Sequence, residues 1–282
     1  MNQAQIPGLG SINECYHGDL VDLNTGGNGL WRVGVDGVRR ILTPLDHKTE
    51  LIVYDDKTLV YIKSALGYPA IYPLSEVAFE GPAEAVLMDL DGTSVRSEGF
   101  WMRIIELTTA GLLEDPFFKL EEDDGPYISG HSVSEHLQYC IDKYCPEKSL
   151  EEARKTYYEI TRSQLQKVLA DDEAARLLAP SPYLKEFLLA LKAHGIKIGL
   201  VTSGLYEKAW PEITTAFDIM DMGDPLDCYD AIITGGYSLG KGRAGTLGEL
   251  TPKPHPWLYA ETARVGLGLE PFRKHKIIGI ED

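Results

Sequence analysis

An apolar run that ends in two carboxylates and a glycine constrains this chain more than any other feature. The segment Ala85 to Ser94 reads AVLMDLDGTS, which predicts a buried strand followed by a turn at Gly92. Because alternate residues of a strand point to the same face, Asp89 and Asp91 are expected to point together. Acids in this position face the crevice beyond the carboxyl ends of strands, where open α/β sheets bind their ligands.

The two acids are suited to different chemical roles. An ionised Asp89 can attack a phosphorus or carbon centre as a nucleophile. The neighbouring negative charge is expected to raise the pKa of Asp91, so that Asp91 can hold a proton for the leaving group. A bound metal ion would assist both steps.

A calcium-binding EF-hand loop does not explain the D-x-D-G pattern. That loop requires a glutamate at its twelfth position. Counted from Asp89 this position is Phe100, and counted from Asp91 it is Met102. The remaining alternative to a catalytic pair is a polar turn after a strand.

Length and charge narrow the class of protein. The chain has 282 residues, 44% of them apolar, which is enough for two folded domains. Its 27 basic and 43 acidic residues give a net charge of -16, which disfavours binding to nucleic acid or to anionic membranes. We therefore expect neither nucleic acid nor membrane as partner, and a small phosphorylated metabolite would need a local positive site.

The sequence predicts a cytoplasmic protein. The N-terminal segment MNQAQIPGLGSINE lacks the basic and then apolar pattern of a signal peptide, and no long apolar run predicts a membrane span. The cysteines show neither C-x-x-C spacing nor the density of a secreted disulfide scaffold. They are Cys15, Cys140, Cys145 and Cys228.

Residues 1–82 are predicted to form a small β-rich unit. LWRVGVDGVRRIL has Asp36-Gly37 between two strand-like halves, which is a strong hairpin signal. ELIVYDDKTLVYIK repeats the plan with a turn over Asp55 to Thr58, and Gly81-Pro82 closes the unit. The unit is a candidate for contact with a partner or with the rest of the chain. Its aromatic residues, either packing residues or a binding face, are Trp31, Tyr54 and Tyr61.

The rest of the chain first shows a helical pattern and then alternates helices with strands. Ser149 and Glu152 predict a capping box at the start of an amphipathic helix. A helix is predicted from Ser181-Pro182 to Gly195, and the buried strand IKIGLV follows it. YDAIIT and HKIIGIED are further strands, with the helix PHPWLYAETARVGLG between them. Helices that lead into apolar strands predict a parallel sheet.

Polar residues follow one strand after another in a fixed order. They are Asp89 and Asp91, then Thr202, then Lys253 in TPKPHPWLY, then Glu281 and Asp282 in IIGIED. In this order the motifs resemble those of the haloacid dehalogenase (HAD) superfamily of hydrolases over residues 84–282. The resemblance is to the subgroup with a helical cap, which includes phosphoglycolate phosphatase-like and β-phosphoglucomutase-like enzymes.

The resemblance implies an α/β fold in three parts. A doubly wound parallel sheet would form the catalytic core from residues 83–99 and 180–282. A helical cap would be inserted between them over residues 100–179, and the β-rich unit of residues 1–82 would precede them. Relatives continue beyond the last motif with another helix and strand, so the core is expected to be truncated at its C-terminus.

The resemblance also implies a phosphatase that hydrolyses a small phosphorylated metabolite, a sugar phosphate or one like phosphoglycolate. The reaction would pass through a phospho-aspartate at Asp89, with Asp91 as the acid and base. The implied phosphate-binding residues are Thr202, Ser203, Gly204 and Lys253. The implied Mg²⁺ ligands are the carboxylates of Asp89 and Asp282, the backbone carbonyl of Asp91, and Glu281 directly or through water.

Two alternatives to a phosphatase stay open. Relatives that dehalogenate or cleave phosphonates do not have an aspartate in the position of Asp91, which favours phosphate esters here. A sugar phosphomutase is the first alternative, although GHSVSEHL has Val133 where a mutase carries a basic residue; His131 or Lys143 would have to substitute. The second is a catalytically silent binding or regulatory protein. His131 is also the candidate for substrate specificity, against a surface or packing role.

An insertion separates Gly236 from Lys253. Its sequence, YSLGKGRAGTLGELTP, is longer than the connection usual in relatives. It is not a phosphate-binding P-loop, because there the Gly-Lys pair is followed by Ser or Thr. Lys241 and Arg243 could reach an anionic substrate, and a solvated insertion is the alternative.

Overall fold

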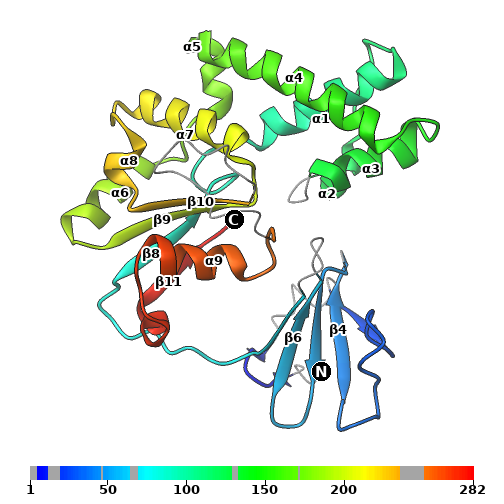
Figure 1. Cartoon of the computed structure of the whole chain (residues 1–282), viewed down its shortest axis with the longest axis vertical. Helices are drawn as coiled ribbons and strands as arrows, with labels where there is room; N and C mark the ends of the chain where they lie inside the picture. Colours follow the sequence, from blue (N-terminus) through cyan, green and yellow to red (C-terminus); the bar gives the residue numbers. More distant parts are fainter. Residues whose placement is uncertain are drawn as a thin grey trace.

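Two larger sheets and a two-stranded ribbon organise the protein (Figure 1). The structure is a computed structural model. It describes residues 5–11, 20–45, 47–63, 69–128, 133–170, 172–235 and 251–282.

The sheet that carries the site is parallel and has the strand order β10-β9-β8-β11. The chain runs from β8 to β9 and β10 on one side and then returns to the other side of β8 with β11. This confirms the doubly wound α/β core, in which the reversal beside β8 marks the ligand crevice. The strands are β8 (Ala85–Asp89), β9 (Lys197–Thr202), β10 (Ala231–Thr234) and β11 (Ile277–Ile280).

Alternate residues of β8 enter two hydrophobic cores, one on each face of the sheet. Val86 and Met88 pack with residues of the helices α6 and α7, whereas Ala85 and Leu87 pack with Leu258 of α9. All of β8 is buried, as expected for a parallel strand that is covered on both faces. The helices are α6 (Leu184–Ala193), α7 (Tyr206–Met220), α8 (Pro225–Cys228) and α9 (Trp257–Glu261), which continues as a π-helix over Thr262–Gly266. A 3-10 helix, Pro271–Lys276, precedes β11.

Helices fill the region between β8 and α6, as the pattern predicts, and lie together above the sheet in Figure 1. The capping box is present: the Ser149 amide donates to Glu152 Oε2 at 2.9 Å, and the Glu152 amide donates to Ser149 Oγ at 3.3 Å. Within the described residues, no helix is long and apolar enough to cross a bilayer. The helices are α1 (Glu98–Leu113), α2 (Gly125–Ile128), α3 (Val133–Tyr144), α4 (Leu150–Ala170) and α5 (Asp172–Ala175), with 3-10 turns at Glu122–Asp124 and Arg176–Leu178.

The second sheet is antiparallel and belongs to the N-terminal part of the chain. Its order is β3-β4-β5-β6-β7, and the tight turn between β5 and β6 lies where ELIVYDDKTLVYIK predicts it. Its strands are β3 (Leu20–Leu23), β4 (Arg40–Pro44), β5 (Thr49–Val53), β6 (Thr58–Ile62) and β7 (Ala70–Pro73); the ribbon is β1 (Gln5–Ile6) with β2 (Gly10–Ser11).

The hairpin predicted around Asp36-Gly37 is wrong in its pairing. Both residues have positive φ, 49° and 81°, and the Val38 amide donates to the Val35 carbonyl, so a turn is present. However, β4 pairs with β3 and not with the segment just before the turn. The local turn signal is correct, but β4 forms its hydrogen bonds with β3, which lies further away in the sequence. Trp31 instead packs on Tyr61, with ring centroids 5.5 Å apart.

Candidate active site

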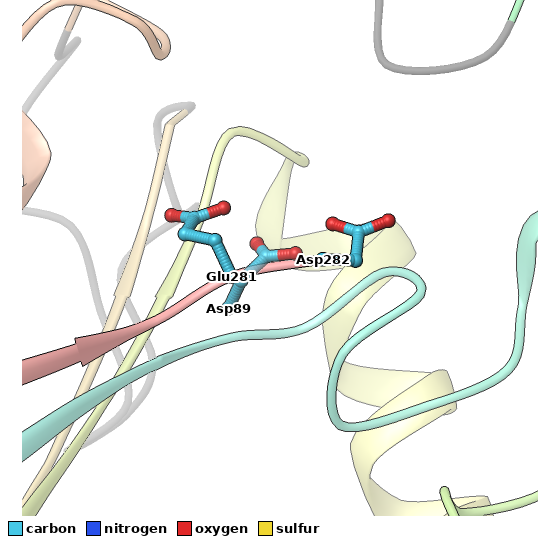
Figure 2. Close-up of side chains that lie close together, drawn as sticks. All are labelled: Asp89, Glu281 and Asp282. Carbon is cyan, nitrogen blue, oxygen red and sulfur yellow. The ribbon is translucent and has the colours of Figure 1, made fainter. Parts of the chain in front are cut away.

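Residues from four segments meet at the carboxyl end of the parallel sheet. Asp89 is the last residue of β8, Thr202 is the last residue of β9, and Lys253 precedes α9. Glu281 and Asp282 follow β11, and Figure 2 shows their carboxylates beside that of Asp89. The order of strands brings these residues together, because parallel strands end at the same edge.

Asp89 forms the centre of the site. It is buried, with 7% of its surface exposed. Lys253 Nζ lies 2.5 Å from Asp89 Oδ1 and 2.9 Å from Glu281 Oε1. Burial raises the pKa of Asp89 to about 6, although the charge of Lys253 acts in the opposite direction. Asp89 is therefore mostly ionised at neutral pH and carries little hydration, which favours a nucleophile.

The loop after β9 is held against Lys253. Ser203 Oγ accepts a hydrogen bond from the Lys253 amide at 3.0 Å, and Thr202 Oγ1 accepts one from the Gly204 amide at 3.0 Å. A side chain at Gly235 would place its Cβ 2.5 Å from the Ser203 carbonyl oxygen, so this close approach requires glycine. Hydrogen bonds therefore join the residues predicted to bind phosphate, Thr202, Ser203, Gly204 and Lys253, to one another.

Three carboxylates could hold a metal ion. Asp89, Glu281 and Asp282 each offer an oxygen, and these oxygens all lie within 4.8 Å of one another. Gly92 has a φ of 79°, and a Cβ there would lie 2.5 Å from Asp282 Oδ2. A hard divalent cation such as Mg²⁺ prefers oxygen ligands of this kind, so the residues fit the predicted metal.

Asp91 faces a different set of groups from Asp89. Its Oδ1 accepts a hydrogen bond from Ser97 Oγ at 2.7 Å. Lys208 Nζ lies 3.2 Å from Oδ1 and 3.3 Å from Oδ2, so the ammonium group contacts both oxygens. The Asp91 side chain is about one-third exposed.

The expected rise in the pKa of Asp91 is wrong. Burial acts to raise this pKa, but the charge of Lys208 and the hydrogen bond from Ser97 outweigh it, and the pKa is lowered. The reason is geometric. β8 ends at Asp89, so the alternation of a strand does not extend to Asp91, and its carboxylate faces a lysine.

Sequence reasoning missed α7 and the two residues that it brings to Asp91. Lys208 Nζ lies over the Trp101 ring, 4.3 Å from its centroid. The Trp101 indole N–H donates to Glu212 Oε1 at 2.9 Å. Glu212 is fully buried, and burial raises its pKa well above the usual range. The spacing of Lys208 and Glu212 is that of an ordinary helical ion pair, which gives no sign of burial.

Other predicted candidates lie apart from these contacts. His131 falls outside the described residues, as do Lys241 and Arg243 of the insertion. Lys143 is the other candidate for the basic residue of a mutase. Its Nζ lies 2.7 Å from both Asp124 Oδ1 and Glu121 Oε2 within the helical region. The candidate site therefore rests on the strand-end residues and on α7.

A comparison with protein families decides the classification. The model of the haloacid dehalogenase-like hydrolases matches residues 83–282. The chain belongs to this family. The resemblance found in the four motifs of this HAD-like chain is thereby confirmed, as is membership of a hydrolase family.

Solved structures similar to this HAD-like chain have low sequence identity to it. A predicted phosphoglycolate phosphatase from Haemophilus somnus is 21% identical, with a TM-score of 0.50, over 71% of this chain and 77% of that one. CbbY from Rhodobacter sphaeroides in complex with phosphate is 18% identical, with a TM-score of 0.48, over 71% and 78%. β-Phosphoglucomutase from Clostridium difficile is 20% identical, with a TM-score of 0.48, over 71% and 77%. A comparison with curated proteins finds no match.

Proposed function

We propose that this HAD-like chain is a Mg²⁺-dependent phosphatase that hydrolyses a small phosphorylated metabolite through a phospho-Asp89 intermediate. The observation that carries the proposal is the contact of a buried, ionisable Asp89 with Lys253 at the end of β8. A nucleophile and a cation at such close range suit transfer of an anionic group, because the cation offsets the repulsion between carboxylate and phosphate.

In the first half of the reaction, an oxygen of Asp89 attacks phosphorus and the bond from phosphorus to the ester oxygen breaks. The leaving oxygen takes a proton from Asp91. Asp91 is ionised before substrate binds, because its pKa is lowered. The negative charge of the bound phosphate then raises that pKa, so that Asp91 takes up a proton from solvent before it protonates the leaving oxygen.

In the second half, Asp91 removes a proton from water, and the water oxygen attacks phosphorus. The bond between phosphorus and Asp89 breaks, which releases phosphate and regenerates the Asp89 carboxylate, and Asp91 returns its proton to solvent. Lys253, Thr202 and the loop at Ser203 and Gly204 would bind the phosphate oxygens throughout. In support, Lys253 contacts Asp89, and its amide donates to Ser203 Oγ.

The carboxylates of Asp89, Glu281 and Asp282, with the backbone carbonyl of Asp91, would hold Mg²⁺. When bound, the ion would neutralise negative charge on the phosphate and on the acids. The room that Gly92 leaves for Asp282 supports this assignment. A cytoplasmic location and a partner contact through residues 1–82 stay predictions.

The test is release of inorganic phosphate from a panel of sugar phosphates, phosphoglycolate and nucleotides, with Mg²⁺ and with a chelator. We expect turnover that requires Mg²⁺ and is lost in Asp89→Asn. The matched control is Asp218→Asn, which changes an exposed aspartate of α7 in the same way and should keep full activity. Turnover by Asp89→Asn, or none by the folded unsubstituted chain, contradicts the proposal.

The same panel of substrates distinguishes a phosphatase from a sugar phosphomutase. A phosphatase releases phosphate in proportion to substrate consumed. A sugar phosphomutase instead converts one sugar phosphate isomer into another and retains the phosphate. A catalytically silent protein does neither, and binding of phosphate without turnover would identify it.

A further inference from the structure

Each of the two proposed catalytic aspartates forms an ion pair with a different lysine. Lys253 contacts Asp89, and Lys208 contacts Asp91. The two ion pairs differ in surroundings: Lys253 comes from the loop before α9, whereas Lys208 lies in the first turn of α7. The proposed reaction uses Lys253 and assigns no role to Lys208.

Lys208 is held in place from two helices. The ring of Trp101, from α1, lies beneath its ammonium group at 4.3 Å. Glu212 lies one turn further along α7 and accepts the indole N–H of Trp101. Trp101 and Glu212 are buried, with 8% and 0% of their surfaces exposed. These contacts restrict a side chain that is otherwise flexible.

The carboxylate of Asp91 is in turn held by Lys208 and Ser97. Ser97 stands directly before α1, and its hydroxyl donates to Asp91 instead of capping that helix. The orientation of Asp91 therefore depends on where α1 meets α7. An exposed ion pair such as Arg39 with Asp55, whose side chains are 63% and 71% exposed, has no comparable enclosure; Lys208 and Asp91 are 22% and 32% exposed.

We propose that Lys208 is a positioning residue that orients the Asp91 carboxylate for proton transfer, and that Trp101 and Glu212 hold Lys208 in place for this purpose. The inference rests on the proposed function, in which Asp91 donates and accepts the proton. In addition, we infer that the Asp91 carboxylate is aligned only when α1 packs against α7. Proton transfer requires the donor within hydrogen-bond reach of the leaving oxygen, so a loss of alignment slows the step that needs the proton.

Comparing kcat/KM for two leaving groups distinguishes a positioning role of Lys208 from a purely structural one, because a structural role would affect both leaving groups equally. p-Nitrophenolate leaves without a proton, whereas an alkoxide needs one. The ratio kcat/KM reports the steps up to formation of phospho-Asp89. Lys208→Met keeps the length and apolar stem of the side chain but removes its charge. We expect it to lower kcat/KM about tenfold or more for the best alkyl phosphate of the panel, with much less change for p-nitrophenyl phosphate.

Two controls accompany Lys208→Met. Lys192→Met removes a lysine from another ion pair, 3.7 Å from Asp230, at the opposite end of β9, and should change neither substrate. Trp101→Phe keeps an aromatic ring near Lys208 but removes the indole N–H bonded to Glu212 together with part of the ring system. It should show the same selective loss to a smaller degree, and it keeps the inference testable if Lys208→Met does not fold.

A double substitution locates the effect. If Lys208 acts through Asp91, then Lys208→Met should have little further effect on kcat/KM in a chain that already carries Asp91→Asn. If the losses of kcat/KM in the two single variants multiply in the double variant, the inference is overturned. An equal loss for both leaving groups, or no loss, while the unsubstituted chain is active would also overturn it. An unsubstituted chain that is folded and inactive overturns the proposed function itself, and the inference with it.

Discussion

Gly92, in the turn after β8, affects where the carboxylate of Asp282 can lie. Its φ of 79° lies in the left-handed region, and a Cβ at this position would be 2.5 Å from Asp282 Oδ2. Two separate requirements therefore select glycine. The backbone conformation disfavours any side chain, and Asp282 occupies the space that a side chain would fill.

We predict that Gly92→Ala weakens Mg²⁺ binding about tenfold or more, because Asp282 must move away from the other two carboxylates. The measurement is calorimetric titration with Mg²⁺, independent of activity. Gly223→Ala is the matched control: Gly223 also has a positive φ, 73°, but a Cβ there has nothing within 4 Å. Both variants should lose about 1 kcal/mol of stability, whereas only Gly92→Ala should lose affinity. Equal affinities in the two variants would contradict the prediction.

The sequence predicted the site residues that follow strands and missed those that tertiary packing supplies. Asp89 and Thr202 could be found because an apolar run before a polar residue marks a strand end, and parallel strands end together. Lys253 was found through the motif order of the resemblance. Lys208 and Glu212 could not, because a Lys and a Glu four residues apart describe an ordinary exposed helix face. In the fold, contacts with other helices bury them, among them those of Trp101 in α1.

The pKa of Asp91 shows the same limit. Two acids separated by one residue predict mutual repulsion, and repulsion predicts a raised pKa. The sequence does not show that β8 ends at Asp89, nor that a lysine more than a hundred residues away contacts Asp91. The sign of a pKa shift depends on such contacts, so it was predicted wrongly while the acid itself was identified.

Among the helices, α3 is joined to the turn before α2 by a buried carboxylate. Asp124 is fully buried. It accepts hydrogen bonds from Tyr139 and Lys143 at 2.7 Å each and from Tyr144 at 2.5 Å. Burial acts to raise the pKa of Asp124, but Lys143 and the two tyrosines outweigh it and lower the pKa to about 2. All three donors belong to α3, so one carboxylate fixes this helix.

We predict that Asp124→Asn destabilises the protein in a pH-dependent manner. A lowered pKa means that the native contacts of Asp124 stabilise the fold above its unfolded-state pKa of about 4, and that this stabilisation is lost as pH falls towards 2. The electrostatic part amounts to about 2 kcal/mol. Urea unfolding of both chains should show the full difference at pH 6 and a smaller one at pH 3. A difference independent of pH would contradict the assignment.

The two sheets were predictable to different degrees. The parallel sheet was correctly predicted, because its strands are continuous apolar runs and helices alternate with them after β8. The antiparallel sheet was predicted as a class, and the pairing of β5 with β6 was predicted correctly, but the pairing of β4 was not. β4 pairs with β3 across the loop that contains Asp36-Gly37, and a short turn signal carries no information about a partner beyond the turn.

The two sheets also have separate hydrophobic cores. In the described residues, the clusters around the antiparallel sheet contain Leu42, Ile52 and Tyr61 but no residue of the parallel sheet. The clusters around β8 contain none of residues 1–82. Among the described residues, ion pairs join the two parts, as in that of Lys48 with Glu135 at 3.2 Å. An ion pair at the surface stabilises only weakly, so the two parts should unfold separately.

We predict that Ile52→Ala destabilises the antiparallel sheet by about 3 kcal/mol, because it leaves a cavity in a core where Ile52 is fully buried. Hydrogen exchange should become faster in β4, β5 and β6, with β8 and β9 unchanged, and phosphatase activity should persist. Ile198→Ala is the reciprocal control, since Ile198 is equally buried in the core of the parallel sheet; it should show the opposite pattern. Faster exchange in both sheets from either substitution would mean that they unfold as one unit, and that the N-terminal sheet supports the site directly.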